Sequence, residues 1–133
     1  DWAGLAALPG ITFVDLQYGD TEAERKAFLD ETGTAILHDD GVDQMADLDA
    51  FAAQVAAMDL IISIDNSTVH MAGALATPVW TLLPFQSDWR WMTERQDSPW
   101  YPEMRLFRQT EPGAWADVIA QVESALKGWL PAG

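Results

Sequence analysis

The stretch from residue 60 to residue 78 decides the fold. It opens with a near-continuous apolar run, Leu60 to Ile64, continues with the polar turn Asp65-Asn66-Ser67-Thr68, and ends in a helix-like segment, Val69 to Leu75, before Thr77-Pro78. The apolar run predicts a buried strand, because strands covered on both faces read as continuous hydrophobic runs. A strand, a polar turn and a helix start in succession predict one unit of an open α/β sheet.

Four more segments have the length and apolar character of strands. They are Ile11 to Leu16, Ala35 to Leu37, Val79 to Leu83 and Arg105 to Phe107. Helix-sized or loop-sized segments separate them, which favours parallel pairing. We therefore expect an α/β, Rossmann-like three-layer domain with a mainly parallel sheet of about five strands. Residues 1–133 contain no repeat or flexible linker, so they predict a single domain, and the start at Asp1 without an initiator methionine suggests part of a longer chain.

Three helices are predicted between and after these strands. The first spans Glu22 to Glu31, where Thr21-Glu22-Ala23-Glu24 resembles a capping box and Gly33 follows the end. Asp47 can cap the second helix. Apolar residues at helical spacing mark its face and that of a third, C-terminal helix: Leu48, Phe51, Ala52 and Val55, then Trp115, Val118, Ile119, Val122, Leu126 and Trp129.

The segment between Leu83 and Arg105 is long for a loop and rich in proline and aromatic residues. Loops of this length are functional or disordered, and the aromatic content favours an ordered loop with a short helical turn around Trp89 to Thr93. Stacking of its tryptophans on a sugar or base is an alternative to their anchoring the loop.

Composition excludes several classes of function. The chain has 21 acidic and 7 basic residues and a net charge of −14, which disfavours binding to nucleic acid or anionic membranes. It lacks cysteine, and its two histidines are far apart, so we expect no metal site and no cofactor. Without a signal peptide or a membrane-spanning run, a cytoplasmic location is expected. Four of the seven bases are Arg90, Arg95, Arg105 and Arg108, so an anion site is expected in the second half.

The turn after residue 64 has the layout of an anion site. Unpaired N–H groups in the first turn of a helix, together with the helix dipole, favour a phosphate there. The hydroxyls of Ser67 and Thr68 could add hydrogen bonds, and His70 lies one turn further on. The alternative is that Asp65, Asn66 or Ser67 simply caps the helix and that His70 is a satisfied, half-buried histidine.

A resemblance favours the anion site. Residues 62–75, Ile62-Ser63-Ile64-Asp65-Asn66-Ser67-Thr68-Val69-His70-Met71-Ala72-Gly73-Ala74-Leu75, with Thr77-Pro78-Val79-Trp80, resemble the donor-site signature of heptosyltransferase-like glycosyltransferases of the GT-B type. The chain is most similar, from about Leu5 to Ala125, to the glycosyltransferase-like region that follows tetratricopeptide repeats in bacterial proteins. Four further stretches carry that likeness: Leu83-Pro84-Phe85, Asp88-Trp89-Arg90-Trp91, Ser98-Pro99-Trp100-Tyr101-Pro102 and Leu106-Phe107-Arg108-Gln109.

The resemblance implies a nucleotide-sugar-binding half of a glycosyltransferase. Amides of Asn66 to Val69 would hold the donor diphosphate, with Asp65 shaping the turn and His70 close by, and Leu16 and Gln17 would lie near the nucleoside. Asn66, Thr68 and Thr77 depart from the family pattern, which puts the donor preference in doubt. The family's N-terminal acceptor domain, which contributes the catalytic base, and its first donor-domain strand with a basic loop have no counterpart here. No catalytic residue is therefore assigned.

Two further groups of polar residues allow more than one interpretation. Arg90 is the preferred arginine for the phosphates, since a guanidinium suits phosphate oxygens, with a solvated surface role as the alternative. His38-Asp39-Asp40-Gly41 is interpreted as an exposed turn rather than a cation site or an acid/base dyad. The expected partners are a nucleotide-diphosphate sugar and the missing acceptor domain or the tetratricopeptide repeats. The rival functions are a non-catalytic interaction or scaffold module and an unrelated nucleotide sensor.

Overall fold

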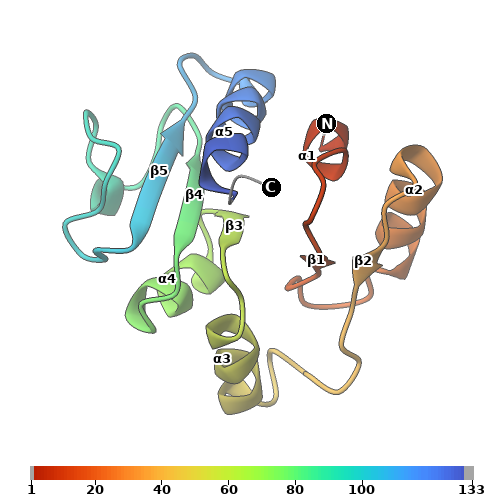
Figure 1. Ribbon diagram of the computed structural model, residues 1–133. Helices are drawn as coiled ribbons and strands as arrows, with labels where there is room; N and C mark the ends of the chain where they lie inside the picture. The colour runs from red at the N-terminus through yellow and green to blue at the C-terminus, as the bar shows by residue number, and fades with distance from the viewer. Residues whose placement is uncertain (1, 131–133) are drawn as a thin grey trace.

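The computed structural model describes residues 2–130, an α/β arrangement in which helices and parallel strands alternate (Figure 1). The elements in chain order are α1 (Ala3–Ala6), β1 (Phe13–Val14), α2 (Glu22–Thr32), β2 (Ile36–Leu37), α3 (Leu48–Ala56), β3 (Ile61–Ile64), α4 (Ser67–Ala74), β4 (Val79–Leu83), the 3-10 turn η1 (Trp89–Trp91), β5 (Met104–Arg108) and α5 (Trp115–Trp129). All strand pairs in this described part are parallel, as predicted. None of its helices is long and apolar enough to cross a membrane.

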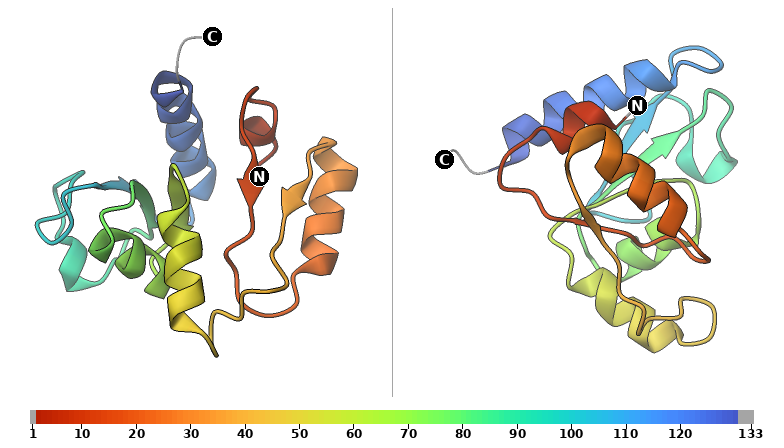
Figure 2. Two further views of the ribbon diagram at one scale, coloured as in Figure 1. Left: turned by 60° about the horizontal axis from the view of Figure 1, so that its bottom comes forward. Right: turned by 90° about the vertical axis from the view of Figure 1, so that its right-hand side faces the viewer.

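The sheet is divided, and here the prediction of one five-stranded sheet is wrong. β1 pairs only with β2, whereas β3, β4 and β5 form a separate sheet in that order. The two sheets lie side by side, with β1 next to β3 (Figures 1 and 2). Only two residue pairs join β1 to β2, against four between β3 and β4 and five between β4 and β5. The larger sheet therefore forms the rigid part of the fold.

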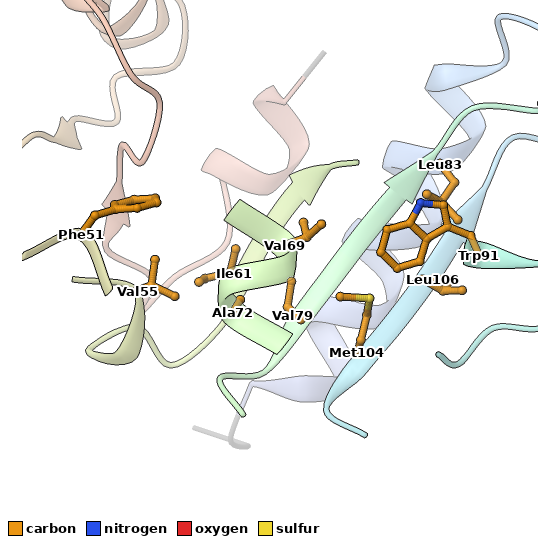
Figure 3. Close-up of a cluster of buried hydrophobic side chains, with 10 residues drawn as sticks. All are labelled: Phe51, Val55, Ile61, Val69, Ala72, Val79, Leu83, Trp91, Met104 and Leu106. Atoms are coloured by element: carbon orange, nitrogen blue, oxygen red, sulfur yellow. The ribbon is translucent and has the colours of Figure 1, made fainter. Parts of the chain in front are cut away.

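Helices cover both faces of the larger sheet, as a three-layer arrangement requires. On one face, α1 and α5 pack against β4 and β5, and α1 lies beside α5 in Figure 2. On the other face, α3, α4 and the loop after β4 pack against the same strands (Figure 3). The buried residues of the first face are Leu5, Trp80, Leu82, Phe107, Val118, Val122 and Leu126. Those of the second are Phe51, Val55, Ile61, Val69, Ala72, Val79, Leu83, Trp91, Met104 and Leu106.

Helix boundaries follow the sequence signals with one exception. Asp47 caps α3 by accepting a hydrogen bond from the amide of Ala50 at 2.9 Å, as predicted. Gly33 ends α2 with a left-handed φ of 73°, which glycine adopts without strain. The predicted capping box at Thr21 is wrong, because the Thr21 hydroxyl donates to the carboxylate of Asp15 and makes no cap bond. The short helix α1 was not predicted.

The loop after β4 is ordered, as its aromatic content predicts. Trp91 is fully buried and ends the turn η1, which lies within the predicted segment. Arg108, on β5, anchors the loop through three hydrogen bonds from its guanidinium. Nη1 donates to Ser87 Oγ at 3.0 Å, Nε donates to the carbonyl of Arg95 at 3.2 Å, and Nη2 donates to the carbonyl of Trp91. Burial lowers the pKa of Arg108 from its usual value. Arg108 is thus a structural clamp for the loop.

Candidate anion-binding site at the start of α4

Helix α4 begins directly at the carboxyl end of β3, and Asn66 makes the turn between them. The side chain of Asn66 accepts from the amide of Thr68 at 3.0 Å and donates through Nδ2 to Ser63 Oγ at 3.0 Å. Asn66 is extended, with φ −156° and ψ −176°, as an N-cap residue should be. The capping interpretation therefore holds for Asn66, whose side chain bonds the amide of Thr68 in the first turn.

One amide of the first turn of α4 is both unpaired along the helix and exposed. The N–H groups of Ser67 and Val69 lie before the first residue of α4 that has an i−4 carbonyl to bond, so neither has a partner along the helix. Ser67 is exposed, whereas Val69 is 0% exposed, so its N–H is covered and its side chain fixes the start of the helix against the core. The Ser67 amide lies at the positive end of the helix dipole, at the carboxyl edge of the sheet.

The Asp65 carboxylate is directed away from that turn and toward the loop after β4. Its Oδ2 accepts from the indole Nε1 of Trp91 at 2.8 Å, and its Oδ1 lies 3.9 Å from His70 Nε2. This bond fixes the indole of Trp91 and keeps the negative charge of Asp65 paired with donors. The Asp65 side chain thus connects the end of β3 to the loop after β4, and the turn itself is made by Asn66.

His70 is enclosed by aromatic rings. Its Nδ1 lies 3.0 Å from the hydroxyl of Tyr101, and its ring stacks on Trp91 at a centroid distance of 5.2 Å and an interplanar angle of 25°. Since Nε2 faces Asp65, both ring nitrogens face protein partners. His70 is therefore the satisfied, half-buried histidine of the alternative interpretation, and it forms a wall of the site rather than a free donor.

Gly73 is a contributor that the sequence did not reveal. A Cβ at this position would collide with ring atoms of Tyr101, so only glycine lets that ring lie against α4. Tyr101 in turn places its hydroxyl on His70. The only signal in the sequence was a glycine inside a helix, where it costs about 1 kcal/mol relative to alanine.

Arg90 is paired within its own loop. Its Nη1 donates to Asp88 Oδ1 at 2.9 Å, and its guanidinium carbon lies 5.0 Å from the centroid of the Trp89 ring. The pKa of Asp88 lies below its ordinary value, mainly because the carboxylate accepts a hydrogen bond from the backbone N–H of Arg90. The Arg90 side chain and, least of all, the charge of His70 lower this pKa further. Asp88 holds Arg90 within the loop, and the structure shows no hydrogen bond or ion pair between the Arg90 side chain and the described residues of α4.

A second polar cluster lies at the carboxyl ends of β1 and β2, and the sequence did not reveal it. Asp15, 6% exposed, accepts from the amide of Gln17 at 2.9 Å and from Thr21. Its Oδ2 lies 3.7 Å from Arg25 Nε and 3.4 Å from His38 Nδ1. Gln17 itself is exposed. The prediction of an exposed turn after β2 is right for residues 39–41, but His38 is half-buried against Asp15.

A hollow of about 840 Å³ adjoins this cluster, between the ends of β1 and β2 and helix α3. Apolar residues line most of it, together with the polar residues His38, Asp39, Asp40 and Gln54. The His38 Nδ1 and Gln54 Oε1 atoms are buried without a hydrogen-bond partner. Within residues 2–130, no group of three or more histidine, aspartate or glutamate side chains is arranged to hold a metal ion.

Comparisons with known proteins give one relative. The chain is 40% identical over 126 residues to Protein FlbA of Caulobacter vibrioides, a match that covers 95% of this chain and 21% of that protein. The chain thus spans about a fifth of the length of the relative. No family model matches the chain. No solved structure matches it either.

Proposed function

We propose that this chain is the nucleotide-sugar-binding half of a glycosyltransferase of the hexosyl or heptosyl type, which holds the donor diphosphate at the start of α4 and is not catalytic alone. The observation that carries the proposal is the first turn of α4 at the carboxyl end of β3, where Ser67 is exposed and its amide is unpaired along the helix. The resemblance of residues 62–80 to a donor-site signature supports the same position.

The surroundings of the turn suit a diphosphate. Asp65, the nearest carboxylate, is engaged with Trp91 and His70, so its charge is partly neutralised by donors. Arg90, held by Asp88, stands on the loop that covers the same end of the sheet. Because its side chain is 48% exposed, it can turn from Asp88 to a phosphate with little change in burial.

Sugar transfer also requires a base that deprotonates the acceptor hydroxyl. His70 is engaged with Tyr101, Trp91 and Asp65, and the Asp15 and His38 pair lies at the other sheet, so neither histidine is proposed as that base. The base and the acceptor site are therefore assigned to a separate acceptor domain. This chain supplies electrostatic support for the leaving diphosphate.

The test is an NMR titration with UDP, ADP and GDP sugars. Shift changes should cluster at residues 65–70, be strongly reduced in a Ser67→Pro variant, which removes the exposed N–H, and be reduced less in a variant that carries Ser67→Ala and His70→Ala. Ser124→Ala, an exposed serine of α5, is the matched control and should titrate like the parent. The absence of shifts at millimolar ligand would contradict a donor site in this chain, and shifts with nucleotide alone that are unchanged by the sugar would favour a nucleotide sensor.

An interaction module is the second candidate, and the exposed aromatic residues of the loop favour it. Trp89 is 71% and Trp100 is 55% exposed, and their rings meet edge to face at 6.4 Å. Phe85, 51% exposed, belongs to the same loop. Exposed aromatic groups of this kind are common at protein interfaces. Loss of binding to the rest of the longer protein on Trp89→Ser, with no effect on nucleotide-sugar binding, would support this second role.

A further inference from the structure

The hollow between the ends of β1 and β2 and helix α3 has a charge that suits a cation. Its polar lining includes the carboxylates of Asp39 and Asp40, and among residues 2–130 no lysine or arginine lines it. The chain up to Asp65 contains 14 acidic residues and only two basic ones, Arg25 and Lys26. A phosphate would therefore be repelled from the hollow, whereas a cation would be attracted to it.

His38 presents a hydrogen-bond acceptor to this hollow. Its Nδ1 is buried and lies 3.4 Å from Oδ2 of Asp15, whose side chain is 3% exposed. A proton on Nδ1 faces that carboxylate favourably and a lone pair does not, so in the neutral ring Nδ1 carries the proton and Nε2 is an acceptor. The other groups at the Asp15 carboxylate, Thr21 and Arg25, also direct protons toward it.

Several acceptors on the wall of the hollow lack donors. Oδ1 of Asp40 lies 3.5 Å from Nε2 of His38, so two acceptors face each other there. Oε1 of Gln54, on α3, is buried and has no hydrogen-bond partner in the described part of the chain. The Asp40 side chain is 98% exposed, so it can move to admit a donor beside the imidazole. A cation with several N–H donors would satisfy these acceptors.

The remaining wall is apolar and favours a cation on an apolar stem. Ala50, Ala53 and Ala57 line the hollow from α3, and Leu37, 55% exposed, lines it from the end of β2. A small inorganic cation would leave these side chains in contact with water, whereas the methylene groups of an alkyl cation would cover them. The volume of about 840 Å³ is in the range of sites that hold a whole ligand, so one alkyl cation would leave much of it unfilled.

We propose that this hollow binds an arginine side chain of a partner polypeptide, with the guanidinium beside His38 and Asp40 and flanking apolar residues of the partner against Leu37 and α3. Arginine suits the site better than lysine because its planar fork offers donors to several acceptors at once. The acidic character of residues 1–65 complements a basic partner and favours its association. The flanking residues fill the space that the arginine leaves. This interaction is separate from nucleotide-sugar binding at α4.

Matched probes test the proposal in an NMR titration of the 133-residue chain. The peptide N-acetyl-Leu-Arg-Leu-amide should shift the amides of Leu37, His38 and Ala53. It should bind at least about 10-fold more tightly than the same peptide with citrulline, the neutral isostere of arginine, and its affinity should fall as salt is added. Butylguanidinium, which has the cation and stem without flanking residues, should bind at the same place and more weakly than the arginine peptide.

Two variants with matched controls locate the site. Asp40→Asn removes the charge beside His38 and should weaken the arginine peptide several-fold, whereas Glu103→Gln removes an exposed charge before β5 and should have little effect. Ala53→Leu fills the hollow from α3 and should abolish binding. Ala56→Leu, at an exposed position of the same helix outside the hollow, should leave binding unchanged.

Three results would overturn the proposal. Equal affinities for the arginine and citrulline peptides, or no shifts at millimolar peptide, would show that the hollow does not recognise the cation. Butylguanidinium that binds as tightly as the arginine peptide would show that the site takes a free small cation rather than a polypeptide. Imidazole nitrogen shifts that show protons on both nitrogens of His38 at about pH 8 would mean that the ring itself neutralises Asp15 and Asp40. None of these results depends on what the α4 turn binds.

Discussion

Replacing Ser67 by proline separates the amide of the α4 turn from its hydroxyl. Ser67 is the first residue of α4, where proline is well tolerated because the N–H is unpaired along the helix. Asn66, before it, has φ −156° and ψ −176°, the extended conformation that a residue before proline prefers. Ser67→Pro should therefore remove one N–H from the site and leave the helix in place, with a change in unfolding free energy within about 0.5 kcal/mol.

The expected loss of affinity follows from the charge of the ligand. A hydrogen bond to a charged group contributes about 1.5–3 kcal/mol, which corresponds to a weakening of the Kd by about 10- to 150-fold. Ser67→Ala removes the hydroxyl alone and should weaken binding less than Ser67→Pro. The measurement is the Kd for a nucleotide-diphosphate sugar by calorimetry or NMR.

Two results would refute the reasoning about the amide. One is an equal Kd for Ser67→Ala and Ser67→Pro, since the N–H would then contribute nothing. The other is a proline variant that binds as tightly as the parent. The fold is checked through the amide shifts of Gly73, whose position against Tyr101 reports on the packing of α4.

Three further predictions concern the packing and charges around the site. Gly73→Ala should lower the free energy of unfolding by about 1–3 kcal/mol in urea denaturation despite the better helix propensity of alanine, because its Cβ meets the Tyr101 ring. In a Tyr101→Ala background the same change should stabilise, and stabilisation in the parent background would contradict the clash. The pKa of Asp88 should lie below 3.8, because the backbone N–H of Arg90 and then its guanidinium favour the carboxylate. Since this folded-state pKa is depressed, its stabilisation is present above pH 3.8 and is lost as the pH falls through the folded pKa. A carboxyl NMR titration checks this, and Arg90→Gln should shift the midpoint upward; an unchanged midpoint would exclude a role for the guanidinium. Arg108→Lys should speed amide exchange in the loop 85–101 and cost about 1–3 kcal/mol, because lysine cannot reach Ser87 and the two loop carbonyls together. Arg105→Lys is the exposed control on the same strand, and equal effects of the two would argue against the clamp.

The elements that were predicted well are those whose signal is local. The apolar run at residues 60–64 became β3, although the prediction that this strand is buried is wrong at Ile64, which is 55% exposed. The helical spacing from Trp115 to Trp129 became α5 with Val118 and Val122 fully buried. Asp47 and Gly33 acted as helix signals because a cap bond or a left-handed residue needs only its neighbours.

The errors have a common cause, which is competition from distant partners. The Thr21 hydroxyl was expected to cap α2, but the buried carboxylate of Asp15 takes it instead. Gly73 is required by Tyr101, 28 positions further along the chain, and no local pattern encodes that contact. The division of the sheet is also non-local. It consists in the missing pairing between β1 and β3, and no local feature of either strand's sequence marks it.

The local structure around residues 65–70 was predicted, but the contacts of their side chains were predicted only in part. Residues 65–70 lie together at the end of β3, where the strand, turn and helix pattern places them. The pattern did not reveal that His70 would be enclosed by Tyr101 and Trp91, because both come from the loop after β4. The groups proposed to bind a ligand are therefore backbone amides. A sequence pattern can locate such amides only by predicting where the helix begins.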